Sequence, residues 1–242
     1  MTTRTTTATG LLLLAALALA GCATSPGAGD TSGTPDAPAT ENAAPGGDAE
    51  LDAAWLDGGR AIGIVTWGSS SCQPIAGEAT ASGQTVTVEI TDQGDACTRD
   101  YVPRASFVPL PEGVDPSQDV EVVVTGTFAG DTDLDGIPGA TPPAAGEPAE
   151  MMPSAGWFDD GGLVLLTYGS SSCPPMFETV ELGAAGEVRA VEAAAAADQV
   201  CTMDYAPRLS VLGVGEVSDD DRPGELVLVS ATGDEQRIAI TG

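Results

Sequence analysis

Residues 66–74 read TWGSSSCQP, and residues 167–175 read TYGSSSCPP. A second motif follows each of them, because residues 97–104 read CTRDYVPR and residues 201–208 read CTMDYAPR. Two motifs that recur in the same order, each built around a cysteine, indicate one duplicated module. The repeat therefore decides the architecture, and the rest of the chain is interpreted around it.

The composition around the repeated motifs suggests where the two modules begin and end. We predict one module in residues 51–128 and the other in residues 154–242. Residues 129–153 are rich in Gly, Pro, Ala and acidic side chains and lack apolar periodicity, which is typical of a linker. We predict that this linker leaves the two modules independent of each other.

Short apolar runs predict strands in both modules. Residues 85–91 alternate apolar and polar side chains with a period of two, as a half-buried strand does. Residues 62–65 and 163–166 are apolar on both faces, which is typical of a central strand. Further strands are predicted at residues 120–124, 187–192, 226–229 and 237–240. The fold class is therefore all-β, with two tandem repeats of a small antiparallel β-sandwich or open barrel.

One segment of the second module conflicts with this pattern. Residues 193–197 are all alanine and have the highest helix propensity in the chain. They directly follow a predicted strand, so we expect a single helical turn there.

The cysteines support the duplication. If Cys22 is set apart, as argued below, each module keeps two cysteines. Four cysteines allow three pairings, and the repeat selects Cys72–Cys97 and Cys173–Cys201. Modules of this size bury a small core, so a structural disulfide in each is expected outside the reducing cytosol.

The charged residues exclude several functions. The chain has 36 acidic and 8 basic residues, all eight of them arginine, and a formal charge of −28. Without histidine or lysine it cannot form a Ser-His-Asp or Cys-His site, a lysine Schiff base or a histidine-ligated zinc site. The acidity argues against nucleic acid as a partner. We therefore predict that the protein is not an enzyme.

The N-terminus has the features of an export signal. Residues 11–20 form an apolar block of Leu and Ala, shorter than the roughly 20 residues that span a bilayer. The block ends in Leu19-Ala20-Gly21-Cys22, which resembles the lipobox of bacterial lipoproteins. The resemblance implies that residues 1–21 are a signal peptide and that Cys22 is lipidated. The alternative is an ordinary secretory signal with a chance cysteine. Residues 22–50 then form the lipidated cysteine and a disordered tether.

The Ser-rich turns are the candidate binding residues. Each places an aromatic ring beside three hydroxyls, and the two sets are Trp67, Ser69, Ser70 and Ser71, and Tyr168, Ser170, Ser171 and Ser172. The turns are interpreted either as structural strand exits, with glycine supplying an unusual dihedral angle, or as recognition loops. The tyrosines of the second motif, Tyr101 and Tyr205, are expected in the module cores. Asp100 and Asp204 are expected to pair with the following arginine or to clamp the turn.

A weak metal motif lies in the predicted linker. Asp131, Asp133 and Asp135, followed by Gly136, resemble the first half of an EF-hand loop and would suit calcium. Pro142 stands where the loop needs its last carboxylate ligand, so an accidental match is the alternative. No other cofactor is predicted.

Taken together, the chain resembles actinobacterial cell-surface lipoproteins of unassigned function. We expect it on the outer face of the cytoplasmic membrane, lipid-anchored within the cell wall. The leading hypothesis is a non-enzymatic binding or scaffolding protein whose partner is an extracytoplasmic protein or a wall component. The alternatives are an acidic-residue or metal-assisted enzyme and a calcium-dependent wall-associated adhesive or structural protein.

Overall fold

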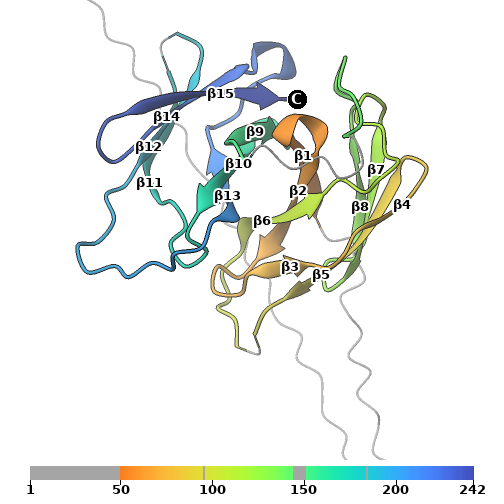
Figure 1. The fold of residues 1–242 in the computed structure, drawn as a ribbon, viewed down its shortest axis with the longest axis horizontal. Coiled ribbons are helices and arrows are strands. Elements are labelled where there is room, and N and C mark those ends of the chain that lie inside the picture. Colours follow the sequence, from red (N-terminus) through yellow and green to blue (C-terminus); the bar gives the residue numbers. More distant parts are fainter. Residues whose placement is uncertain (1–49, 95, 144–150, 184) are drawn as a thin grey trace, which may run out of the picture. The chain divides into compact units, whose positions relative to one another are not determined.

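The computed structural model describes residues 50–94, 96–143, 151–183 and 185–242 (Figure 1). The strands are β1 (Leu51–Leu56), β2 (Ala61–Gly68), β3 (Pro74–Ala76), β4 (Thr80–Ser82), β5 (Thr85–Asp92), β6 (Val102–Pro109), β7 (Val120–Gly126), β8 (Gly130–Leu134), β9 (Ser154–Trp157), β10 (Gly162–Gly169), β11 (Phe177–Leu182), β12 (Val188–Glu192), β13 (Ala206–Gly213), β14 (Glu225–Val229) and β15 (Glu235–Thr241). Two short 3-10 helices, η1 (Asp57–Gly59) and η2 (Asp219–Asp221), are the only helices within the described ranges. The predicted all-β class is confirmed. No helix in this part of the chain is long and apolar enough to cross a bilayer.

The first module consists of two sheets packed face to face. One sheet has the order β1-β2-β6, and the other has the order β3-β5-β7-β8 with β4 added beside β5. Their facing side chains form one core, in which Trp55 and Ile64 of the first sheet meet Val88 and Val122 of the second. Burial of these side chains stabilises the module by about 25 cal/mol per Å² of apolar surface.

The second module repeats the same strand order as one sheet of seven strands, β11-β12-β14-β15-β9-β10-β13. Each strand of the second module has a counterpart in the first. For example, β12 corresponds to β5, and β13 corresponds to β6. The sheets join in the second module because β15 pairs with β9 at Ile240 and Ala155. The counterparts β8 and β1 lie close together but belong to separate sheets.

Three strand pairs are parallel, whereas the sequence predicted antiparallel pairs throughout. They are β5 with β7, β12 with β14 and β15 with β9. The first two have the same cause, because the chain leaves β5 or β12, crosses to the other sheet region as β6 or β13, and returns beside the strand it left. Such a crossover brings the returning strand back in the same direction.

Strand β8 lies inside residues 129–153, which the sequence analysis assigned to a linker. It pairs with β7 and corresponds to β15, so it completes the first module. Its sequence, GDTDL, alternates acidic and small residues and buries Leu134 alone among its members. The prediction of a linker is wrong here, because a charged edge strand has the same composition as a linker.

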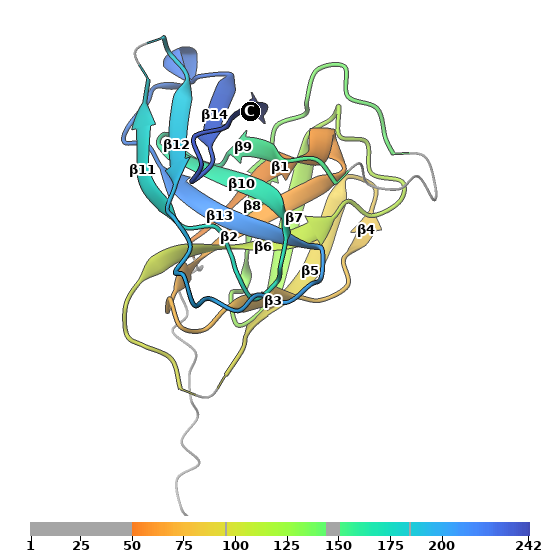
Figure 2. The ribbon, with the colours of Figure 1, turned by 60° about the vertical axis from the view of Figure 1, so that its left-hand side comes forward.

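The two modules share a third apolar cluster. It contains Ala54, Leu56, Ala61 and Val65 of the first module with Val164 and Leu166 of the second. In both views, β10 and β13 lie against β2 and β6 (Figures 1 and 2). Strands β2 and β10 are thus buried on both faces, one toward their own core and one toward the other module. The modules therefore pack against each other and are not separated by the linker as predicted.

The expected helical turn at residues 193–197 is also absent. Residues 193–196 form no helix or strand, and a simple turn brings the Gln199 amide to the Ala196 carbonyl at 3.0 Å. The strands predicted at residues 226–229 and 237–240 are present as β14 and β15, which pair antiparallel with each other.

Candidate functional site

Both predicted disulfides are present. Cys72 is bonded to Cys97 and Cys173 to Cys201, with Cα–Cα distances of 5.5 and 5.6 Å. Each joins the Ser-rich turn at the end of β2 or β10 to the segment that precedes β6 or β13. The repeated motifs are therefore adjacent in space, and together they form one closed turn in each module.

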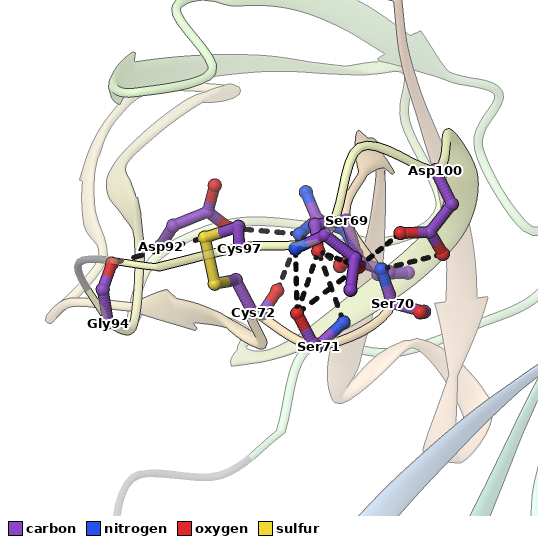
Figure 3. A network of polar contacts seen from close by, with 10 residues as sticks. Ser69, Ser70, Ser71, Cys72, Asp92, Gly94, Cys97 and Asp100 are labelled. Atoms are coloured by element: carbon purple, nitrogen blue, oxygen red, sulfur yellow. Dashed lines mark hydrogen bonds and ion pairs between the residues drawn. A yellow bond between two sulfur atoms is a disulfide. The ribbon is translucent and has the colours of Figure 1, made fainter.

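In the first module the hydroxyls of this turn bond to one another (Figure 3). Ser69 Oγ lies 2.6 Å from Thr98 Oγ1 and 3.0 Å from Ser71 Oγ. The backbone amides of Ser71 and Thr98 donate to Ser69 Oγ and Ser71 Oγ at 3.2 and 3.0 Å. Ser69 is buried, whereas Ser70 and Ser71 are exposed. These contacts fix the turn, as the structural interpretation predicted.

Asp100 clamps the turn from its open side. The Ser70 amide donates to Asp100 Oδ2 at 3.1 Å, and the Thr98 hydroxyl donates to Asp100 Oδ1 (Figure 3). These hydrogen bonds from Ser70 and Thr98 favour the ionised form and lower the pKa of Asp100 to about 2. Of the two roles predicted for this aspartate, the structure supports the clamp.

The second module repeats the network at equivalent residues. Ser170 Oγ lies 2.8 Å from Thr202 Oγ1, and the Thr202 amide donates to Ser172 Oγ at 3.0 Å. The Ser171 amide donates to Asp204 Oδ1 at 3.1 Å, and hydrogen bonds from Ser171 and Thr202 lower the pKa of Asp204 to about 2. The equivalent hydroxyls and carboxylates thus hold the turn closed in both modules.

Beneath the first turn lies Arg104, which is buried. Its Nη1 donates to the carbonyls of Ser69 and Cys72 and to Asp92 Oδ1, the last at 3.0 Å. The guanidinium also lies 5.1 Å from the ring centroid of Phe128. Asp92 was not predicted as a partner of Arg104, because it ends strand β5 outside both motifs and nothing in the local pattern directs its side chain toward the turn.

The glycine of the turn is required by this arginine. A Cβ at Gly68 would collide with the Arg104 guanidinium, and a Cβ at Gly169 would lie 2.7 Å from Cζ of Arg208. Neither glycine has a positive φ. The expectation that an unusual dihedral angle explains these glycines is therefore wrong, and close approach of the guanidinium explains them instead.

The aromatic rings are placed differently from the prediction. Trp67 is half-buried against the cluster between the modules, and half-buried Tyr168 stacks on Tyr205 with 5.7 Å between ring centroids. Tyr101 and Tyr205, expected in the cores, are 66% and 63% exposed. Tyr101 and Tyr205 each lie in a polar segment just before a strand. This position in the sequence could have indicated that they are exposed.

The candidate calcium residues do not form a loop. Asp131 and Asp133 lie in strand β8, opposite Val123 and Glu121, and the Asp135 carbonyl accepts a hydrogen bond from Trp55 Nε1 at 2.8 Å. The extended strand spaces Asp131 and Asp133 along the sheet edge, and Asp135 follows the strand, so the three residues do not form an EF-hand-type loop. Among the described residues, no group of three or more histidine, cysteine or acidic side chains could hold a metal ion.

The predicted signal peptide (residues 1–21), Cys22 and all but the last residue of the predicted tether lie outside the described residues. Comparisons with protein-family models, curated proteins and solved structures found no significant match.

Proposed function

We propose that the protein is a membrane-anchored extracytoplasmic lipoprotein that acts as a non-enzymatic binding or scaffolding protein. The segment that ends in Cys22 supports export and lipidation. Two disulfides are consistent with a compartment outside the reducing cytosol.

A repeated, exposed tyrosine is the observation that carries the binding role. Tyr101 and Tyr205 occupy the same position beside the two closed turns and are mostly exposed. A disulfide and a hydroxyl network hold each turn, so little conformational entropy is lost when such a ring is covered. Tyrosine offers a large amphipathic surface and is enriched in interfaces. Two linked copies raise the effective concentration of the second site for a partner that itself carries a repeated ligand.

The polar residues of the turns favour binding over catalysis. The serine hydroxyls bond to threonine hydroxyls and backbone amides within their own turn. A serine nucleophile needs an adjacent base, and the clamping aspartates hold low pKa values that make them weak bases.

The test compares a Tyr101→Ser/Tyr205→Ser double variant with the wild-type protein. Both are tested for co-sedimentation with cell walls and for capture of envelope proteins. We expect retention of the partner to fall about tenfold, with an unchanged melting temperature. Leu182→Ser is the control, because this exposed leucine ends strand β11, at the opposite end of the strand from the Cys173 turn. Equal loss in both variants, or no loss in the tyrosine variant, would contradict the proposed surface.

A further inference from the structure

The two modules differ at the residue that faces the arginine beneath the closed turn. Ala76 and Phe177 are equivalent, because each follows the first cysteine of its module at the same distance. Ala76 pairs with Ile90 in the first module, and Phe177 pairs with Glu192 in the second. The residue two positions beyond Ile90 is Asp92, and its counterpart beyond Glu192 is Ala194. The carboxylate that neutralises Arg104 is therefore replaced by a methyl group in the second module.

Arg208 keeps the other contacts of its counterpart. Its Nη1 donates to the Cys173 carbonyl at 2.7 Å and its Nη2 to the Tyr168 carbonyl at 3.2 Å. It forms no ion pair with any described residue, and its Nε is buried without a hydrogen-bond partner. Arg104 also leaves Nε and Nη2 without partners, but Asp92 balances its charge.

A half-open cavity of about 450 Å³ lies at this position. Its polar walls are Arg208, Glu192 and Gln199, and its apolar walls include Met176 and the alanines 193–196. The missing aspartate side chain and the cavity thus coincide at Ala194. A cavity of this size accommodates a small organic molecule.

We propose that this cavity binds a small carboxylate ligand, whose carboxylate contacts Arg208 as Asp92 contacts Arg104 and whose apolar body lies against Met176 and the alanines. Guanidinium and carboxylate form charge-assisted hydrogen bonds that strengthen away from bulk water. Glu192 on the same wall disfavours dianions such as sulfate and phosphate. The site depends on neither the lipid anchor nor the exposed tyrosines, so it stands or falls separately from the function proposed above.

Calorimetric titration of the full chain, purified in a neutral detergent, with hexanoate tests the proposal. We expect one saturable site per chain and binding at least about tenfold weaker for hexanamide, which lacks the charge. Sulfate should bind more weakly than hexanoate. The absence of saturable hexanoate binding, or sulfate binding as tight as hexanoate, would overturn the proposal.

Ala194→Asp is the decisive variant because it restores the arrangement of the first module. The new carboxylate should pair with Arg208, reduce hexanoate affinity by about tenfold or more, and leave the melting temperature unchanged or raised. Ala194→Asn has similar volume without the charge and should retain more of the binding. Arg208→Gln should likewise reduce hexanoate affinity by about tenfold or more, and near-UV circular dichroism checks that this variant is folded. Undiminished hexanoate binding by a folded Ala194→Asp protein would refute the site.

Discussion

The Trp67 ring meets the Phe158 ring edge to face, with 6.2 Å between their centroids and 68° between their planes. Trp67 is the next-to-last residue of strand β2 in the first module and Phe158 follows β9 of the second, so this contact crosses the boundary between the repeats. Both rings pack against the shared cluster formed by residues such as Val65 and Leu166. The duplication has therefore produced a pair of modules that stabilise each other.

Replacing Trp67 tests this coupling. Because the ring is half-buried in the shared cluster, Trp67→Ala should lower the free energy of unfolding by about 2–3 kcal/mol. Urea unfolding followed by far-UV circular dichroism measures the change, and exposed Met152→Ala is the control. A change below about 0.5 kcal/mol would mean that Trp67 belongs to the surface.

The disulfides give a second test of the coupling. Cys72→Ala/Cys97→Ala should cost about 3 kcal/mol by opening a loop with a sequence separation of 25 residues. Because the apolar cluster joins the modules, calorimetry should still show one transition at a lower temperature. Cys173→Ala/Cys201→Ala should behave alike. Two separated transitions, with one at the wild-type temperature, would restore the independence that the sequence predicted.

The sequence predicted those parts of the fold that local patterns determine. Alternation identified β5, and the duplication alone selected the correct disulfides from three pairings. The double-sided apolar runs at β2 and β10 correctly indicated strands buried on both faces. Nothing in those runs indicated that the other module provides the second covering layer, because an apolar face does not specify its partner.

The candidate site was harder to predict for a related reason. The Ser-rich turns and Asp100 lie within the motifs, so their clamp could be anticipated. Asp92 lies outside both motifs and becomes a partner of Arg104 only when the ends of β5 and β6 come together beneath the turn. Polar composition likewise concealed β8, since an acidic edge strand and a linker share the same residues.

The lipid anchor is tested at Cys22. Wild-type protein should partition with the membrane fraction, and Cys22→Ser should accumulate as an unprocessed precursor or be released, because the thiol that would carry the lipid is gone. Membrane fractionation and detergent-phase separation followed by immunoblotting measure the distribution. Normal cleavage and unchanged detergent partitioning of the variant would contradict lipidation.

Asp52 should make stability depend on pH. Burial, followed by the charges of Asp159 and Glu50, raises the pKa of this side chain from 3.8 to about 6. The folded state then binds a proton more tightly than the unfolded state, so this group's contribution to stability falls as pH rises from about 4 to 6. Asp52→Asn should therefore be more stable than wild type at pH 7 and similar to it at pH 4. Thermal melts across this range measure the difference, with exposed Asp131→Asn as the control.

The ion pair between Asp92 and Arg104 should be essential to the first module. The arginine side chain is 4% exposed and the aspartate 25%, so removal of the carboxylate leaves a buried guanidinium uncompensated. Asp92→Ala should lower the free energy of unfolding by about 3 kcal/mol or more. Asp92→Ala/Arg104→Met removes both charges and should recover part of this loss, since no isolated charge remains buried. Urea unfolding of the two variants separates these effects. Equal stability of Asp92→Ala and wild type would show that the backbone carbonyls of Ser69 and Cys72 suffice for Arg104.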